Sequence, residues 1–165
     1  MEHAKQPTTS VPATTISFFL IALVWIAFDR WTKTIADSHE VGEVFVDNIA
    51  NLFEFKLIHN TGAAWGIFGD SPIPLGIFSL VVCLFIFLYV FALRRAQGPL
   101  GETIALAFVF AGGVGNALDR FMQGYVTDFI HTTFIEFPVF NVADIGVTCG
   151  IIVFLLVALL EARKG

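Results

Sequence analysis

Hydrophobic residues gather into four long runs along this chain, separated by segments that are richer in polar residues. The runs cover residues 16–33, 73–93, 102–120 and 142–161. A helix that crosses the apolar core of a bilayer, about 30 Å thick, needs roughly 20 predominantly apolar residues. The pattern therefore predicts four transmembrane helices, which form a single integral membrane domain over residues 1–165.

The segments between the runs have a different pattern. Residues 34–72 include the stretch EVFVDNIANLFEFKLIHN, in which apolar and polar positions alternate around several phenylalanines. Alternation with a period of two residues is typical of β-strands. We expect short strands in this outer loop and a second, aromatic outer loop over residues 121–141. The predicted fold is mainly α, with four transmembrane helices, a small β-rich extracytoplasmic element and an outer-face loop.

Composition agrees with a membrane protein. Of the 165 residues, 56% are hydrophobic and only 14% are charged, whereas soluble domains carry about 25% charged residues. The net charge of −5 comes mainly from the outer loops and gives no indication of a nucleic-acid partner. Cys83, Cys149 and the four histidines lack metal-binding spacing, so the sequence predicts no metal or cofactor and two buried cysteines.

Basic residues beside the runs indicate the orientation of the chain. Cytoplasmic loops of membrane proteins hold an excess of Lys and Arg. In the predicted topology these basic residues fall on one side of the membrane, opposite the acidic loop over residues 34–72, which predicts that both termini are cytoplasmic. They are Lys5, Arg94, Arg95, Arg163 and Lys164.

Acidic residues near the ends of the runs are the main functional signal. A carboxylate at the centre of a span costs about 2.5–3.5 kcal/mol, which disfavours that depth for several acids at once. In the predicted topology, all four acids of interest lie at the outer end of a span or just outside it. We therefore expect one site at this level that contains Asp29, Asp119, Asp128 and Asp144.

Helical spacing places further polar residues beside these acids. Asn116 is followed by Asp119 and Arg120 at positions plus three and plus four, which predicts an amide, an acid and a guanidinium on one helix face. Glycines one turn earlier, including Gly112, would let another helix approach closely. Arg120 alternatively anchors the end of a helix at the lipid headgroups.

Three other polar groups leave two interpretations open. Asn141, three residues before Asp144, is either the N-cap of a helix or part of the site. Asp29 and Lys33, four residues apart, form either an interfacial ion pair with extended stems or a brace for the site. Asn60 in the motif NTGAAWG is either a turn residue or a residue close to a substrate backbone.

The motifs DRWTK, NTGAAWG, GGVGNALDR, VTDF and FNVAD, in this order on four predicted spans, resemble the lipoprotein signal peptidase family, also called signal peptidase II. The family usually has glutamine at the position of Arg30. The resemblance implies an aspartic endopeptidase of the bacterial cytoplasmic (inner) membrane, with its active site near the periplasmic face. It further implies that the enzyme removes the signal peptide of diacylglyceryl-modified prolipoproteins immediately before the lipidated cysteine.

By the same resemblance, Asp128 of VTDF and Asp144 of FNVAD are the catalytic pair. Two carboxylates that share a site cannot both ionise cheaply, so one keeps a proton while the other activates a water. Partners would be diacylated prolipoproteins and membrane lipid, and we expect a monomer because four spans can build the site. Roles in binding substrate or supporting the pair are implied for Asn60, Asn116, Arg120, Asn141, Asp119, Asp29 and Lys33.

Two other classes of protein share some of these features. A small proton-coupled membrane transporter would also use acids within its spans, but it would need one near the middle of the membrane, and the centres of the four runs lack one. A noncatalytic scaffold would use the glycine-rich helix for packing alone. A scaffold would tolerate Asp128→Asn and Asp144→Asn, whereas a peptidase would lose cleavage with either change.

Overall fold

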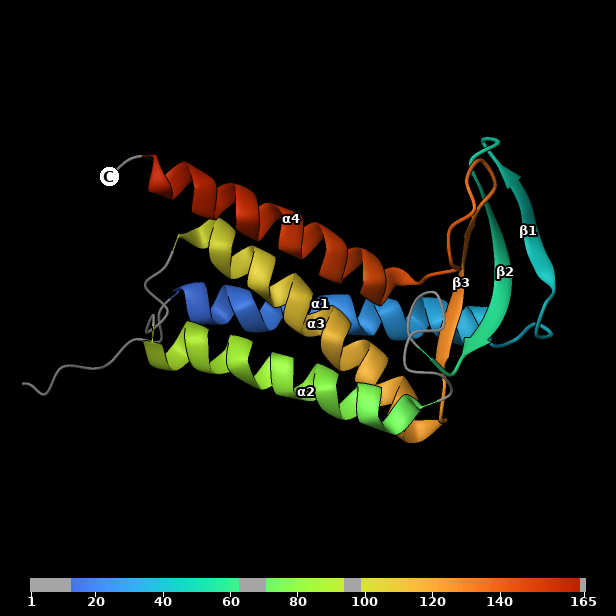
Figure 1. Cartoon of the computed structure of the whole chain (residues 1–165), viewed down its shortest axis with the longest axis horizontal. Helices are drawn as coiled ribbons and strands as arrows, with labels where there is room; N and C mark the ends of the chain where they lie inside the picture. Colours follow the sequence, from blue (N-terminus) through green and yellow to red (C-terminus); the bar gives the residue numbers. More distant parts are fainter. Residues whose placement is uncertain (1–12, 63–70, 94–98, 164–165) are drawn as a thin grey trace, which may run out of the picture.

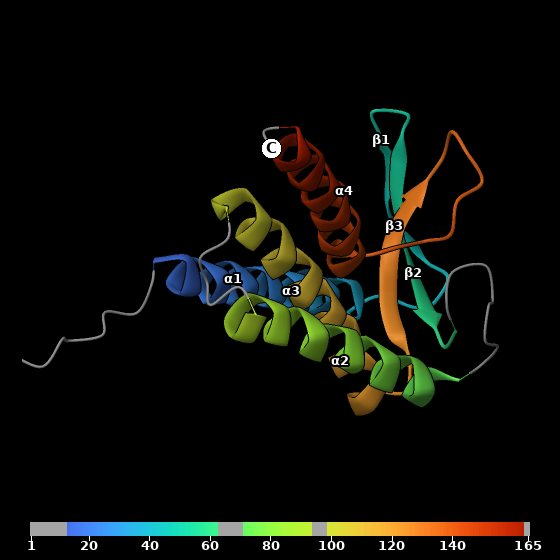
Figure 2. The same cartoon turned by 60° about the vertical axis from the view of Figure 1, so that its left-hand side comes forward.

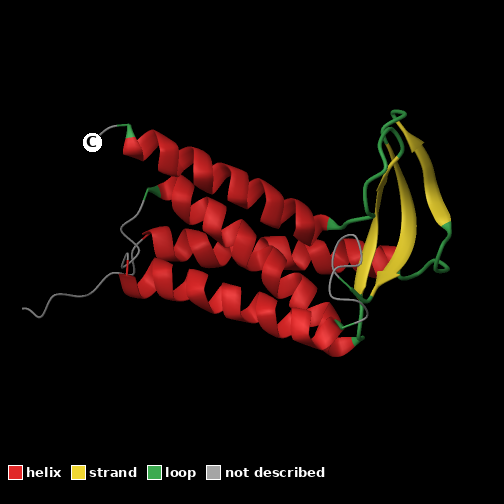
Figure 3. Cartoon of the chain, in the orientation of Figure 1, coloured by secondary structure: helices red, strands yellow, loops and turns green. Residues whose placement is uncertain are grey.

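The structure is a computed structural model that describes residues 13–62, 71–93 and 99–163. Four long helices run side by side, and a three-stranded antiparallel sheet stands at one end of them (Figures 1 and 3). This arrangement confirms the predicted fold class. In chain order the elements are α1 (Ala13–Ala36), β1 (Val44–Ile49), β2 (Phe53–Asn60), α2 (Pro72–Leu88), the π-helical turn η2 (Tyr89–Leu93), α3 (Leu100–Met122), β3 (Val126–Thr132) and α4 (Val142–Ala162).

The four long helices are apolar and long enough to cross a membrane. In α3, 56% of the most apolar window is buried inside the protein, against 17–22% in the other three spans. Helices that face lipid expose their apolar side chains, because lipid tails are as apolar as those side chains. The central helix is therefore α3, which packs against α1, α2 and α4.

Glycines allow α3 and α4 to pack closely. A Cβ atom at Gly112 of α3 would lie 2.3 Å from the carbonyl oxygen of Ala143, and one at Gly150 of α4 would lie 2.6 Å from that of Ala105. Neither approach is possible for real atoms, so any side chain here would push the helices apart. Small residues commonly permit such contacts in membranes, and the packing role predicted for Gly112 is confirmed.

The sheet has the order β1-β2-β3, and both strand pairs are antiparallel. Strands β1 and β2 lie in the loop where short strands were predicted, but β3 lies within residues 121–141, which were predicted as a loop. That prediction missed β3 because five of the seven residues of VTDFIHT are buried and the other two are half-buried, so the strand lacks the polar–apolar alternation of a half-exposed one. The register pairs Asn60 with Val126 and Ile58 with Asp128.

An apolar cluster joins the sheet to the helices. Its buried members are Ala36 of α1, Leu57 of β2, Phe129 of β3 and Val142 of α4. Figure 2 shows that β3 passes close to the beginning of α4, and contacts also link β3 to α1 and α3. This packing holds the strand that carries Asp128 against the helix that carries Asp144.

Candidate active site

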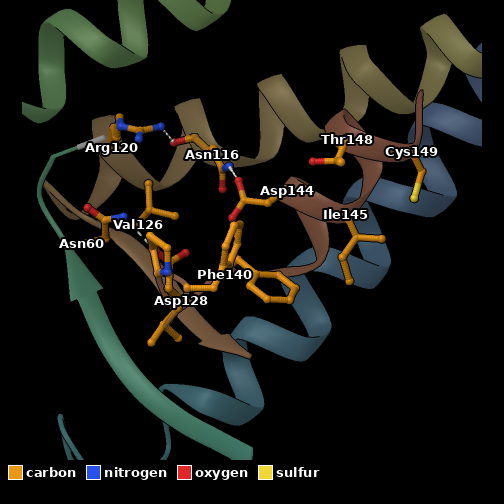
Figure 4. A pocket seen from close by; sticks show the side chains of 13 residues that line it. Asn60, Asn116, Arg120, Val126, Asp128, Phe140, Asp144, Ile145, Thr148 and Cys149 are labelled. Carbon is orange, nitrogen blue, oxygen red and sulfur yellow. Dashed lines mark hydrogen bonds between the residues drawn. The ribbon is translucent and has the colours of Figure 1, made fainter. Parts of the chain in front are cut away.

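A cavity of about 430 Å³ lies where β3 meets α3 and α4 (Figure 4). Asp128 of β3 and Asp144 in the first turn of α4 both line this cavity, and Asp128 is only 2% exposed. We call these two residues the carboxylate pair. The lining also contains the polar residues Asn60, Asn116 and Arg120 and the apolar residues Phe137, Phe140 and Ile145.

Each oxygen of the carboxylate pair accepts a hydrogen bond from an asparagine. For Asp128, Oδ2 accepts from Nδ2 of Asn60 at 2.8 Å and Oδ1 accepts from Nδ2 of Asn141 at 2.7 Å. For Asp144, Oδ1 accepts from Nδ2 of Asn116 at 2.8 Å and Oδ2 accepts from the backbone N–H of Asn141 at 3.1 Å. Three asparagines thus fix both carboxyl groups without adding charge.

Asn141 links the two halves of the pair. Its side-chain Oδ1 accepts the backbone N–H of Asp144 at 3.0 Å, which completes a reciprocal capping box at the start of α4. The residue before it, Phe140, forms a bridge with Ile130 of β3, which brings the segment back beside Asp128. Both interpretations of Asn141 from the sequence therefore apply, because it is the helix N-cap and also a partner of both acids.

The surroundings of Asp128 alter its acidity. Burial, followed by the negative charge of Asp144, raises the pKa of Asp128 from 3.8 to about 7, although hydrogen bonds from Asn60 and Asn141 act in the opposite direction. A carboxyl with this pKa is about half protonated near pH 7 and mostly protonated below it. The carboxylate pair can therefore keep one proton between its two members.

A second group of charged residues lies beside the carboxylate pair, and we call it the ion cluster: Asp29, Lys33, Asp119 and Arg30. Nζ of Lys33 lies 2.9 Å from Oδ2 of Asp29 and 2.8 Å from Oδ2 of Asp119, and these three side chains are buried. Arg30 pairs with Oδ1 of Asp119. The predicted ion pair between Asp29 and Lys33 is therefore confirmed, but its burial contradicts the interpretation that the stems extend to the membrane interface.

The ion cluster touches the carboxylate pair through one amide. Nζ of Lys33 donates to Oδ1 of Asn116 at 2.9 Å, and Nδ2 of the same amide donates to Asp144. Oδ1 of Asp29 accepts the backbone N–H of Ala143, in the first turn of α4, at 2.9 Å. The ion cluster thus supports the helix and the amide that hold Asp144.

Asp119 and Arg120 bond different partners, although their spacing predicted one helix face for Asn116, Asp119 and Arg120. Asp119 faces α1, where its partners are Lys33 and Arg30. Arg120 donates from Nη2 to the carbonyl oxygen of Gly62 at 3.3 Å, and from Nη1 to that of Asn116 at 3.4 Å. Successive helical residues point about 100° apart, which explains why these neighbours contact different elements.

Some functional features of the site were not predicted. Thr127 is fully buried beside Asp128, and its Oγ1 donates to Oδ1 of Asp37 at 3.0 Å, just beyond the end of α1. The motif VTDF contains Thr127, but the contact joins residues 90 positions apart. Cys149 was expected to be buried, and it is exposed on α4 and lines the cavity, whereas Cys83 is buried as expected.

Fold and site together define a class of protein. Two aspartates on different elements, Asp128 buried and Asp144 half-buried, share one cavity at the end of four membrane-spanning helices, the arrangement with which aspartic peptidases activate water. Among residues 13–62, 71–93 and 99–163, no group of three or more His, Cys, Asp or Glu side chains is placed to hold a metal ion.

Comparison with known proteins identifies the family. Residues 21–160 match the family described as Signal peptidase (SPase) II. A lipoprotein signal peptidase of Deinococcus radiodurans is 35% identical over 156 residues, which cover 88% of this chain and 80% of that protein. One of Brevibacillus brevis is 38% identical over 148 residues, which cover 89% and 97%. A solved bacterial membrane enzyme structure superposes with a TM-score of 0.79 at 32% identity and covers 89% of both chains.

The chain belongs to the signal peptidase II family, the lipoprotein signal peptidases. It is an aspartic peptidase that removes signal peptides from prolipoproteins, and a multi-pass membrane protein of bacteria. The resemblance recognised in the five motifs is confirmed. The proton-coupled transporter and the noncatalytic scaffold are both wrong.

Proposed function

We propose that Asp128 and Asp144 are the catalytic residues, and that they hydrolyse diacylglyceryl-modified prolipoproteins immediately before the lipidated cysteine. The observation that carries this proposal is the set of four hydrogen bonds through which Asn60, Asn116 and Asn141 hold both carboxyl groups in one cavity. Such fixed geometry is what general acid–base catalysis requires.

The two carboxyl groups take different roles at the start of the reaction. Asp144 lies at the N-terminus of α4, where the helix dipole stabilises negative charge, and it accepts a hydrogen bond from Asn116. It is the member that carries the charge and takes a proton from the attacking water. The pKa of Asp128, raised to about 7, supports this residue as the member that starts protonated.

The reaction then follows from the proton positions. The water attacks the scissile carbonyl carbon while Asp144 accepts its proton, and the proton of Asp128 forms a hydrogen bond to the carbonyl oxygen, where negative charge develops. When the tetrahedral intermediate collapses, the C–N bond breaks and a proton passes from a carboxyl group to the leaving nitrogen. The pair ends with one proton, as it began, and no covalent intermediate forms.

The position of the site suits a substrate anchored in lipid. The carboxylate pair lies at the sheet end of the helices, and Phe137, Phe140 and Ile145 provide an apolar wall beside it. Burial of acyl chains contributes about 0.8 kcal/mol per CH₂ group, so a diacylglyceryl group would hold the cleavage point at a fixed depth.

We also propose that both termini are cytoplasmic and that the sheet faces the periplasm. The beginning of α1 and the end of α4 lie together at the end of the bundle opposite the sheet, which supports a common side for the termini (Figure 1). Arg163 lies at that end, while the other basic residues that indicate this orientation, Lys5, Arg94, Arg95 and Lys164, lie outside the described residues. The monomeric state stays a prediction.

The test is cleavage of a diacylated prolipoprotein by purified Asp128→Asn and Asp144→Asn variants. Because each change removes one half of the proton exchange, we expect each to lower kcat by at least about 10³-fold. Asp47→Asn on the exposed strand β1 is the matched control and should cleave normally. Circular dichroism would verify that all three variants fold. Substantial turnover by either pair variant would refute the assignment.

A further inference from the structure

We propose that Arg30 is a positioning residue for the reaction: by neutralising Asp119 it leaves the ammonium of Lys33 able to hold Asn116, which in turn holds Asp144. The inference rests on the proposed catalytic role of Asp144 and extends it to a residue on α1 that does not touch the acid.

Charge balance within the ion cluster requires Arg30. Asp29 and Asp119 are both fully buried and contribute two negative charges, whereas Lys33, also fully buried, contributes one positive charge. Arg30 supplies the second positive charge through a side chain that is 35% exposed. Without it, one buried carboxylate beside the carboxylate pair would be uncompensated, a costly arrangement inside a protein.

The ammonium group of Lys33 is shared among three oxygens in the balanced cluster. It forms ion pairs with Oδ2 of Asp29 at 2.9 Å and Oδ2 of Asp119 at 2.8 Å, and it donates a hydrogen bond to Oδ1 of Asn116 at 2.9 Å. Arg30 takes the other oxygen of Asp119. Loss of Arg30 leaves that oxygen unpaired and increases the pull of Asp119 on the ammonium, at the expense of the bond to Asn116.

The bond from Lys33, the charged one of two donors to Oδ1 of Asn116, stabilises the orientation of this amide; the second donor is Nδ2 of Asn141 at 3.1 Å. With Oδ1 turned to the ammonium, Nδ2 must face Oδ1 of Asp144, to which it donates at 2.8 Å. A reversed amide would set its oxygen against a carboxylate oxygen and its NH₂ group against a cation. Arg30 thus acts on the reaction through three intervening side chains: Asp119, Lys33 and Asn116.

Position distinguishes this role from substrate binding. Among the described residues, Asn116 lines the cavity and Arg30 does not. Removal of Arg30 should therefore lower kcat and leave KM nearly unchanged, because its effect reaches the substrate only through Asp144.

The experiment compares Arg30→Met, Arg30→Lys and the double variant Arg30→Met/Asp119→Asn with the full-length enzyme, using a diacylated prolipoprotein in detergent. We expect Arg30→Met to lower kcat about tenfold, the effect of one charge-assisted hydrogen bond, with KM within about twofold. Its extra uncompensated negative charge should also move the alkaline limb of the pH–rate profile to higher pH. Arg30→Lys, which keeps the positive charge, should recover most of the rate.

The double variant is the decisive arm. Asp119→Asn removes the negative charge that Arg30 compensates, so the remaining Lys33 and Asp29 are balanced again and kcat should rise above that of Arg30→Met. A merely structural role predicts the opposite, a double variant no faster than the single one, and that result would overturn the inference. Normal kcat in Arg30→Met would overturn it as well.

Two further variants keep the test decisive. Arg163→Met, at the exposed end of α4, is the matched control and should leave kcat unchanged; an equal loss there would count against a specific role for Arg30. If Arg30→Met does not fold, Arg30→Gln replaces it, because glutamine keeps a hydrogen-bond donor but carries no charge. A kcat of Arg30→Gln equal to that of Arg30→Lys would show that the charge of Arg30 is not needed and would overturn the inference.

The failure of this inference can be told apart from failure of the proposed function. Cleavage by Asp144→Asn would refute the catalytic role of Asp144 itself. An inactive Asp144→Asn together with a normal kcat of Arg30→Met would refute only the role of Arg30.

Discussion

Two pairs of aspartates lie side by side in this protein, all of them buried except the half-buried Asp144, and the pairs are stabilised by different means. Asp29 and Asp119 are held by the cations Lys33 and Arg30, so their charges sum to zero. The carboxylate pair, Asp128 and Asp144, is held by the neutral amides of three asparagines. The cations neutralise Asp29 and Asp119, so neither needs a proton. The amides fix the positions of Asp128 and Asp144 without neutralising them, so a shared proton is needed to relieve the repulsion between these two carboxyl groups.

One amide separates these two environments. Asn116 presents its oxygen to Lys33 and its nitrogen to Asp144, and among the described residues the ion pairs of Lys33 are with Asp29 and Asp119 rather than with the carboxylate pair. A direct ion pair would hold Asp144 permanently as a carboxylate and oppose its uptake of a proton. The contrast between the pairs suggests that one serves stability and the other serves chemistry, which can be tested by substitution.

The largest effect on stability should come from Lys33→Met. This change leaves two buried carboxylates with one remaining cation, and breaking a buried ion pair costs about 3–5 kcal/mol. The free energy of unfolding in detergent would measure it. Lys56→Met, on β2, is the matched control, and its effect should stay within about 1 kcal/mol. Similar losses for both lysines would contradict the structural role of the ion cluster.

Asp128→Asn should instead change how stability depends on pH. The pKa of Asp128 is raised from 3.8 to about 7, so the folded state binds more protons than the unfolded state between these values. The free energy of unfolding of the unaltered protein should therefore fall as pH rises from about 4 to 7, by up to about 1.4 kcal/mol per pH unit. The substitution removes this contribution, so its curve should be flatter; parallel curves at pH 5 and pH 8 would contradict the raised pKa.

Asn60→Ala should slow cleavage and shift its pH dependence. The hydrogen bond from Asn60 favours the charged form of Asp128 and lowers its pKa, so its loss should raise that pKa further. We expect kcat to fall about tenfold and the alkaline limb of the pH–rate profile to move to higher pH by less than about one unit. A limb that moves to lower pH would show that Asn60 does not stabilise the ionised acid.

The smallest effect should come from Thr127→Val. It removes the hydroxyl that donates to Asp37 and accepts from Gln123 but keeps the shape of the side chain. We expect the free energy of unfolding to fall by about 1 kcal/mol, with kcat changed less than about threefold, because the amides still hold Asp128. Thr127→Ser keeps the hydroxyl and should behave like the unaltered protein. A large loss of kcat in Thr127→Val, with normal kcat in Thr127→Ser, would show that the contact between Thr127 and Asp37 is needed for catalysis.

Local patterns predicted most of the fold. The four helices follow from runs of apolar residues, because span length is set by the thickness of the bilayer. Strands β1 and β2 follow from alternation, but β3 is buried on both faces and its sequence resembles that of a loop beside the third helix. The place of β3 in the sheet depends on its pairing with β2, and this pairing cannot be predicted from the local sequence pattern of either strand.

For the site, motifs predicted the residues better than their contacts. Asp128, Asp144 and the three asparagines were all named from the sequence, and the structure brings them together. The partners of Asp119 were not predicted: spacing placed it on one helix face with Arg120, whereas in the structure it pairs with Lys33 and with Arg30, 89 positions away. Contacts between helices depend on the rotation of each helix about its axis, which tertiary packing determines.

The capping box at the start of α4 makes one atom serve two purposes. Oδ2 of Asp144 accepts the backbone N–H of Asn141 and thereby closes the first turn of the helix. A proton that settles on this oxygen during hydrolysis competes with that bond, and loss of a cap costs about 1 kcal/mol. If Asp144 takes up the proton as proposed, we expect turnover to loosen the first turn of the fourth span, so that amide hydrogen exchange there is faster while the enzyme processes substrate.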